Sequence, residues 1–236
     1  MFFLITITII LYTMYYSRVD NTVTKEDIVY INKILNENNI KEYNGVSYYD
    51  EIEFIKKVLD VIYLIAPSGV GLPINETREP KDLFLIGRGA CFDKSRVIEK
   101  ILNLNGFKTR HISSYLNEKN FKVLTLLTKN ITSHAATEVY TKKGWIVLGT
   151  YDKWMSLDSK NMPISSNEIR NNLNSNILWK YKLPKNLDYY YSYKGSEMII
   201  VYGLYSRHGK FYPPYNFIPD IEWNEFIYNF TEYFND

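Results

Sequence analysis

Hydrophobic residues in the first third of the chain recur with the period of an α-helix, and each periodic segment follows a capping signal. Thr24 with Asp27 forms a pattern like a capping box, and Ser47 with Asp50 repeats it. These signals predict one helix that ends among the asparagines near position 38 and a second helix that stops before Pro67. The apolar positions that carry the period are Ile28, Ile31, Ile34 and Leu35 in the first helix, and Ile52, Ile55, Leu59, Ile62 and Ile65 in the second.

The middle of the chain contains one helical pattern followed by strand-like runs. Cys91–Leu104 has apolar residues at helical spacing, and Asn105-Gly106 closes it as a helix stop. Lys142–Gly144 is typical of the turn of a hairpin between the last two runs. One helix followed by consecutive antiparallel strands favours an α+β fold over a doubly wound sheet. The predicted strands are Phe107–Ser113, Phe121–Thr128, His134–Thr141 and Trp145–Thr150.

The last third of the chain adds shorter elements around this centre. We find no internal repeat and no flexible linker between two cores, so we expect residues 19–236 to form a single domain. The predicted elements outside the centre are a loop at Ser68–Lys81, a short helix capped by Ser165 and Glu168, a strand at Met198–Ser206, a Pro-rich and aromatic surface segment at His208–Trp223, and a final helix at Glu222–Phe234.

The N-terminal segment differs from everything that follows it. Phe2–Tyr16 carries no charge, and Arg18 and Asp20 come directly after it. As a helix it would be about 22 Å long, short of the ~30 Å hydrocarbon core of a bilayer. We expect residues 1–18 to be a single-pass signal anchor or transmembrane segment, with the domain on the extracytoplasmic side, although few flanking charges define the orientation. A cleaved signal peptide and a buried core element are the alternatives. A tyrosine cluster that suits a membrane interface consists of Tyr12, Tyr15 and Tyr16.

Composition and charge narrow the classes of partner. The apolar share of 46% is ordinary for a folded protein, and the net charge is +2 with no stretch that concentrates Lys and Arg. This distribution argues against nucleic acid as a partner. The 22 tyrosines fit either an AT-rich genome or a surface that binds a glycan. The single cysteine cannot form an intramolecular disulfide, so the fold depends on its core alone.

That cysteine, Cys91, stands at the start of the predicted central helix. Backbone N–H groups and the helix dipole stabilise an anion there, and Arg88 and Lys94 would add to the effect. We therefore expect the pKa of the Cys91 thiol to be lower than that of a free cysteine, as a nucleophile requires. The alternative interpretation is a small buried apolar residue without chemistry.

Further along the chain, Ser133–Tyr140 (SHAATEVY) and Gly144–Leu148 (GWIVL) place a histidine, an acidic residue and a tryptophan in a fixed order. With Cys91 at a helix start, the positions His134, Glu138 and Trp145 resemble the transglutaminase-like superfamily of the papain-type cysteine fold. The resemblance covers roughly residues 72–157. It implies a nucleophile helix packed on an antiparallel sheet, a Cys91–His134 pair, and acyl transfer or hydrolysis on a peptide or carboxamide without a cofactor.

The chain departs from the family pattern at two positions. The family usually has an Asp four residues after the tryptophan, where this chain has Gly149, and an aromatic residue two after the histidine, where it has Ala136. Asp152 could replace the missing carboxylate only if the strand bends, because three residues of extended strand span about 10 Å. A glycine makes such a bend plausible. We therefore predict Asp152 as the third catalytic residue.

The other polar candidates have weaker support. His111 is expected to be a structural or surface residue, and His208, at the end of a predicted strand, is expected to be a solvated loop residue, with a position lining a cleft as the alternative. Three scattered histidines and one cysteine lack metal-ligand spacing, so we predict no metal site. Glu138 should face the same side of its strand as His134 and pair with an arginine. If the Cys–His pair is inactive, the remaining function is a binding or assembly module at the membrane, for a peptide or a glycan. The sequence leaves both hypotheses open.

Overall fold

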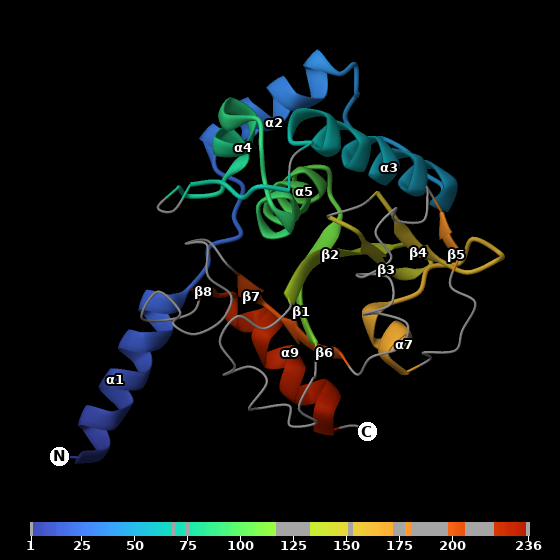
Figure 1. The fold of residues 1–236 in the computed structure, drawn as a ribbon. Coiled ribbons are helices and arrows are strands. Elements are labelled where there is room, and N and C mark those ends of the chain that lie inside the picture. Colours follow the sequence, from blue (N-terminus) through green and yellow to red (C-terminus); the bar gives the residue numbers. More distant parts are fainter. Residues whose placement is uncertain are drawn as a thin grey trace.

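The computed structural model describes residues 2–67, 69–73, 76–116, 133–150, 153–171, 178–180, 198–205 and 220–234. Within these ranges it has helices and antiparallel strands, which confirms the α+β class (Figure 1). The predicted strand at 121–128, Asp152 and His208 lie outside the described residues.

The capping signals of the first third are confirmed. Helix α2 (Lys25–Glu37) begins after a complete capping box of Thr24 and Asp27. Helix α3 (Tyr48–Ile65) begins after the box of Ser47 and Asp50, and it ends one residue before Ala66-Pro67. In both boxes the carboxylate of the third helical residue accepts from the N–H of the cap, which satisfies donors that a helix start leaves open.

The next two helices surround the cysteine. Helix α4 (Pro80–Ile86) was not predicted from the sequence; its proline stands at the first helical position and Gly87 ends it with a φ of 68°. Helix α5 (Cys91–Leu104) has the predicted bounds. Every side chain of α5 from Asp93 to Leu102 is buried, including five that are ionisable: Asp93, Lys94, Arg96, Glu99 and Lys100.

The main sheet has six strands in the order β5-β4-β3-β2-β1-β6, and every pairing in it is antiparallel. The hairpin at Lys142 and Lys143 joins β2 and β3 as predicted. The strands β4 and β5 were not predicted. The bounds are β1 (Lys108–Leu116), β2 (Ser133–Thr141), β3 (Gly144–Leu148), β4 (Met155–Leu157), β5 (Leu178–Lys180) and β6 (Met198–Tyr202).

The predicted strand at 198–206 divides at Gly203 into two strands of different sheets. Gly203 has a φ of 70°, and a Cβ there would lie 2.5 Å from the carbonyl oxygen of Glu222. Only glycine fits this close approach. The chain then enters β7 (Leu204–Tyr205), which pairs with β8 (Asp220–Ile221).

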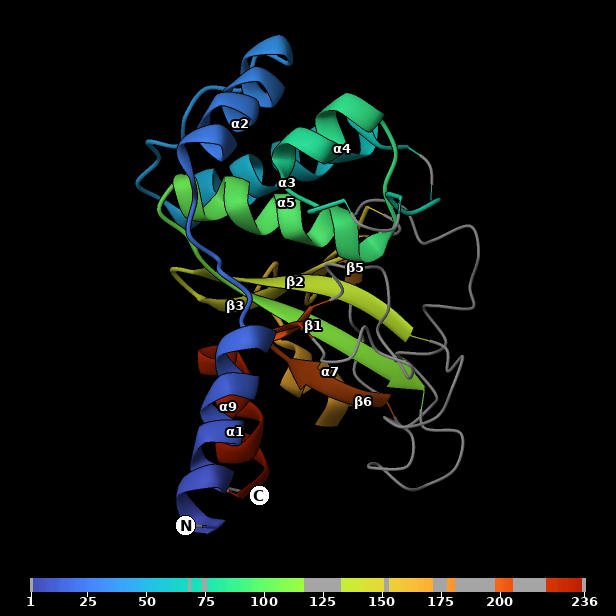
Figure 2. The same cartoon turned by 90° about the vertical axis from the view of Figure 1, so that its left-hand side faces the viewer.

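Helices cover both faces of the main sheet. Helices α2 to α5 lie on one face, with α5 against β1 and β2, while α7 (Ser166–Asn171) and α9 (Trp223–Phe234) lie on the other side (Figures 1 and 2). The Asn229 amide of α9 accepts from the N–H of Tyr202 and donates to its carbonyl. This side chain therefore satisfies backbone groups at the open edge of β6.

The apolar N-terminal run is a helix, α1 (Phe2–Ser17), that projects away from the domain (Figure 1). Its apolar side chains are largely exposed, for example Ile9 at 59% and Leu11 at 60%, so they are not part of a core. Its last turn is attached: Trp223 donates to the Met14 carbonyl at 3.0 Å. Within the described part of the chain, no helix combines the length and apolar character needed to cross a membrane. The anchor therefore stays a prediction.

Candidate active site

The turn before Cys91 is held close to α4. A Cβ at Gly89 would lie 2.6 Å from Leu83 Cδ1, and Leu83 is fully buried. Asp93 Oδ2 accepts from the N–H of Ala90 at 2.9 Å, so the third helical residue closes the helix start. The packing and the cap together fix the point at which the chain enters α5, and Cys91 is the first residue of that helix.

Asp93 also attaches a loop to this helix start. The same Oδ2 accepts from the N–H of Leu72 at 2.9 Å, and Oδ1 accepts from the Arg78 guanidinium at 2.7 Å. Both charged side chains are buried, with 2% of Arg78 and none of Asp93 exposed. Because a buried charge requires a partner, this ion pair fixes the loop beside Cys91. The guanidinium lies 5.1 Å from the centre of the Phe92 ring.

The structure brings Cys91 to the start of the strand that carries His134. The backbone N–H of Ala135, the residue after His134, is among the groups that act to lower the pKa of the Cys91 thiol. Cys91 also packs against the buried cluster that contains Ala135 and Tyr115. His134 itself is buried. Helix α5 and strand β2 thus place the two predicted partners in one region of the fold.

The electrostatics of this pair correct one expectation. Burial raises the pKa of the Cys91 thiol, and Asp93 adds to the rise, although N–H groups of Ala135, Phe92 and Cys91 act in the opposite direction. The expected helix-start effect is present, but desolvation outweighs it. Burial lowers the pKa of His134 to about 4, with the charge of His111 as a further cause. Both shifts favour the neutral forms, a thiol at Cys91 and an uncharged imidazole at His134.

The chain does bend after Gly149. The N–H of Gly149 donates to the carbonyl of Trp154 at 2.9 Å, and Leu148 of β3 pairs with Met155 of β4, so the backbone reverses between them. The connection contains Asp152, whose predicted role falls outside the described residues. The Thr150 hydroxyl donates to the carbonyl of Ala135, which ties the end of β3 to the residue beside His134.

Comparison with known proteins gives the family of this region. A model of the transglutaminase-like superfamily matches residues 54–150. The matched segment is transglutaminase-like. It runs from α3 through the end of β3 and contains Cys91, His134 and Gly149, while Asp152 lies two residues beyond it.

The other two comparisons add only distant structural likeness. No curated protein matches the chain. A solved structure of a candidate cysteine protease from Cytophaga hutchinsonii is similar at 17% identity and a TM-score of 0.36. The alignment covers 55% of this chain and 43% of that one, so the chain spans less than half of that protein.

Glu138 of the transglutaminase-like segment has the role that the sequence predicts. Its carboxylate is fully buried and contacts Arg110 Nε of β1 at 2.5 Å. The other carboxylate oxygen accepts from the N–H of Ser166 at 2.6 Å and from its hydroxyl at 2.9 Å. The Arg110 guanidinium lies 4.1 Å from the centre of the Trp145 ring and 4.4 Å from that of Tyr202. This cluster is structural, because its charges are compensated on every side.

A second buried polar cluster lies between α5 and the sheet, and it was not predicted from the sequence. Glu99 Oε1 accepts from the Ser95 hydroxyl at 3.0 Å and lies 2.8 Å from His111 Nδ1. The Thr137 hydroxyl is 2.6 Å from that of Ser95. The Tyr205 hydroxyl donates to the second Glu99 oxygen at 2.8 Å. A signal that could have found it is the polar i, i+4 spacing of Cys91, Ser95 and Glu99 on one helix face.

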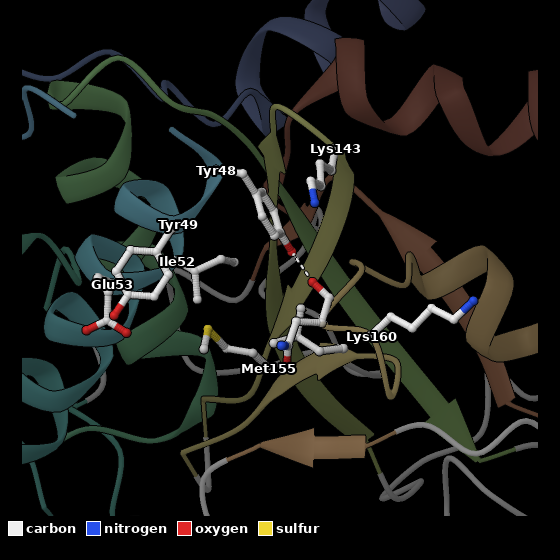
Figure 3. A pocket seen from close by; sticks show the side chains of 9 residues that line it. Tyr48, Tyr49, Ile52, Glu53, Lys143, Met155 and Lys160 are labelled. Carbon is white, nitrogen blue, oxygen red and sulfur yellow. Dashed lines mark hydrogen bonds between the residues drawn. The ribbon is translucent and has the colours of Figure 1, made fainter. Parts of the chain in front are cut away.

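The described residues contain no group of three or more His, Cys, Asp or Glu side chains arranged to hold a metal ion. They do contain a hollow of about 290 Å³ between the start of α3 and the β3–β4 region (Figure 3). The Tyr48 hydroxyl donates to the Asn161 carbonyl at 2.8 Å along one wall, and Lys143 Nζ lies 4.6 Å from the centre of the Tyr48 ring. Neither Cys91 nor His134 lines this hollow.

Proposed function

We propose that this protein is a cysteine enzyme of the transglutaminase-like type that transfers or hydrolyses an acyl group through Cys91 and His134. The observation that carries the proposal is the packing of Cys91 against the buried cluster that contains Ala135, because Ala135 directly follows His134 in β2. The match of residues 54–150 to the superfamily supports it. The substrate class would be a peptide or protein carboxamide.

The neutral resting pair suggests a general-base sequence. His134 accepts the thiol proton as the sulfur attacks the carbonyl carbon, so a C–S bond forms and the carbonyl oxygen becomes negative. Backbone N–H groups at the start of α5 would stabilise that oxygen. The oxyanion then collapses, the C–N bond breaks, and His134 returns the proton to the leaving amine. Water or a second amine next attacks the thioester and releases Cys91.

The test measures ammonia release from a blocked Gln-Gly dipeptide, with hydroxylamine as an amine acceptor. We expect activity in the native chain, none in Cys91→Ala, and a loss of at least about 100-fold in His134→Gln, the usual scale for a general base. Cys91 is the single cysteine of the chain, so no second thiol complicates the result. Equal activity in the native chain and Cys91→Ala would refute the proposal.

We further propose Asp152 as the residue that orients His134. The support is the reversal of the backbone after Gly149, which a straight strand would not provide. Asp152→Asn should reduce activity, whereas Asp158→Asn is the matched control. Asp158 is a nearby carboxylate that accepts from the N–H groups of Lys160 and Met162 in its own loop. Gly149→Asp tests the same idea by supplying a carboxylate at the position where the family usually has one.

A specific observation favours a second candidate, a catalytically inactive binding or assembly module. The family's usual carboxylate position is Gly149, and the pKa of His134 near 4 disfavours the imidazolium that such a carboxylate would stabilise. The ligand would be a peptide or a glycan, and the aromatic hollow beside Tyr48 and Tyr49 is one place for it. Binding of a peptide or glycan by Cys91→Ala with native affinity, together with an absence of turnover in the native chain, would support this candidate.

We also propose that α1 tethers the domain to a membrane, with the domain on the extracytoplasmic side. The support is an uncharged helix of 16 residues whose apolar side chains are exposed and which projects from the domain (Figure 1). At about 24 Å it is short for a perpendicular span. Flotation with phosphatidylcholine vesicles should retain the full chain and lose a variant without residues 2–13. Equal flotation of both would refute the tether.

A further inference from the structure

The hollow between the first turns of α3 and strand β4 is separate from the candidate active site. Its volume of about 290 Å³ is close to the lower end of the range for small-molecule sites, about 300–1,000 Å³. Figure 3 shows Tyr49 and Glu53 on one side of it and Lys160 on the other. A ligand in this hollow would contact neither Cys91 nor His134.

A second hollow adjoins the first along α3. It measures about 390 Å³, and Glu53 lines both hollows. The lining of the second hollow is mostly polar and includes Lys41, Glu42 and Asn44 from the segment before α3. A ligand with more than one unit can therefore contact both hollows, one on each side of Glu53.

The first hollow combines an aromatic wall with an apolar floor. Tyr49 is 70% exposed, whereas Met155 and Leu157 beneath the hollow are buried. The neighbouring Tyr48 is held in place, because its hydroxyl donates to the Asn161 carbonyl at 2.8 Å. An exposed aromatic face beside an apolar floor favours a ligand that presents C–H groups.

The charged groups around these apolar surfaces nearly balance. A site without an excess of one sign does not select a polyanion or a polycation, so the lining favours a neutral ligand rich in hydrogen-bonding groups. The Glu53 carboxylate makes no hydrogen bond or ion pair with the described part of the chain and can accept from such a ligand. The charged residues that line the two hollows are Lys41, Lys57, Lys143, Lys160, Glu42, Asp50 and Glu53.

The sheet topology argues against an extended peptide in this place. Strand β4, which contributes Met155 and Leu157, has β3 on one side and β5 on the other. Its backbone groups are therefore not available to pair with an added strand, which is a common way in which a protein binds an extended peptide. A ring-shaped ligand with apolar faces and hydroxyl groups does not need such an edge.

We propose that the two hollows form a binding site for a glycan. One sugar ring stacks on Tyr49 above the apolar floor, and Glu53 accepts hydrogen bonds from its hydroxyl groups. The polar second hollow receives the continuation of the glycan. This inference deepens the second candidate function, a binding module, and rests on it; it does not require acyl transfer at Cys91.

The test titrates the full chain with three neutral disaccharides, cellobiose, maltose and diacetylchitobiose, and follows binding by saturation-transfer NMR. We expect at least one of them to bind with a dissociation constant in the millimolar range or below. Tyr49→Ala should weaken that binding at least about tenfold, because the stacking face and the apolar area that it buries are both lost. Glu53→Ala should also weaken it, while Glu53→Gln, which keeps an acceptor, should retain most of it.

Tyr140→Ala is the matched control. Tyr140 is 51% exposed on β2 and lines neither hollow, so its loss should leave the affinity unchanged. Tyr49→Ala should keep the fold, because the side chain is exposed and alanine is the better helix former. Circular dichroism checks both variants.

Three outcomes would overturn the glycan site: unchanged affinity in Tyr49→Ala, an equal loss in Tyr140→Ala, or no binding of any of the three disaccharides. Ammonia release by the native chain would refute an inactive module, but it would leave a positive binding result intact. The failure of the glycan site and the failure of the second candidate function are therefore distinguishable.

Discussion

Strand β2 separates two buried polar clusters that differ in how completely their charges are compensated. On the face away from α5, Glu138 pairs with Arg110, whose charge is permanent, and both Glu138 oxygens have donors within 2.9 Å. On the face toward α5, Glu99 Oε1 lies 2.8 Å from Nδ1 of His111. There one ring nitrogen remains without a partner among the described residues.

The difference lies in how completely the buried hydrogen-bonding groups of each cluster are satisfied. A buried pair of permanent charges with all its hydrogen bonds made has one stable state, and removing either member leaves an isolated charge. In the Glu99 cluster, by contrast, the buried Nε2 of His111 makes no hydrogen bond to the described residues, so this cluster is the less completely satisfied of the two. The clusters lie on opposite faces of β2, and the Glu99 cluster lies on the face covered by α5, the helix that begins with Cys91.

The largest expected effect is on stability, at the compensated cluster. Glu138→Ala leaves the Arg110 guanidinium buried without its carboxylate, which should lower the free energy of unfolding by about 3–5 kcal/mol. Urea denaturation measures it. The control is Asp60→Ala, which breaks the exposed Lys153–Asp60 pair at 2.9 Å and should cost at most about 1 kcal/mol. Similar losses in both variants would contradict the assignment of Glu138 as structural.

The next effect depends on pH and belongs to His134. Its pKa is about 4 in the folded chain and 6.5 when unperturbed, so above pH 6.5 both states are neutral and no stability depends on it. As the pH falls from 6.5 to 4, the unfolded state binds a proton that the folded state does not, and stability decreases by about 3 kcal/mol in total. His134→Gln should lose less stability over this interval. Parallel pH profiles of native chain and variant would show that His134 is not buried as described.

A smaller effect is expected in the Glu99 cluster itself. Ser95→Ala removes a hydroxyl that contacts Glu99, His111 and Thr137, and unmade buried hydrogen bonds should lower the free energy of unfolding by about 1–2 kcal/mol. Thr77→Ala is the control, since its hydroxyl contacts Asp82 at the surface at 2.7 Å. A loss as large as that of Glu138→Ala would mean that the two clusters do not differ in the way described.

The smallest expected effect on stability comes from removing most of α1, whose side chains are largely exposed. Removal of residues 2–13 should change the free energy of unfolding by less than about 0.5 kcal/mol, because the exposed turns make few contacts. The deletion leaves Met14, Ser17 and Val19, where the attachment to the domain is made. A large decrease in the free energy of unfolding would mean that α1 packs against the domain.

Local signals in the sequence predicted the elements whose ends are defined by short-range chemistry. The capping boxes indicated α2 and α3, and the helix start and Asn105-Gly106 indicated α5. Helix α4 was missed because seven residues give too short a period to recognise. The break at Gly203 was missed because its cause is the Glu222 carbonyl, which is distant along the chain.

The site was predictable where a motif specified it and unpredictable where burial decided it. The order of Cys91 and His134 indicated the pair, and the partner of Glu138 was expected to be an arginine. The raised thiol pKa was not foreseen, because desolvation depends on how completely neighbouring elements cover the sulfur. The Glu99–His111 pair was missed for a similar reason: a helix with five charged residues predicts a solvent face, yet α5 is covered all round.

The attachment of residue 19 to residue 221 has a consequence for the order in which the fold is assembled during synthesis. The N–H of Val19 donates to the carbonyl of Ile221 at 2.9 Å, and Arg96 is held by the Asp20 carbonyl just after it. Translation delivers Val19 and Ile221 about 200 residues apart, so the segment after α1 waits for its partner until β8 has been made. The surroundings of the thiol helix are therefore assembled late. A nascent chain that still lacks β8 cannot form the Val19–Ile221 contact, so the segment beside α5 is not yet fixed by it.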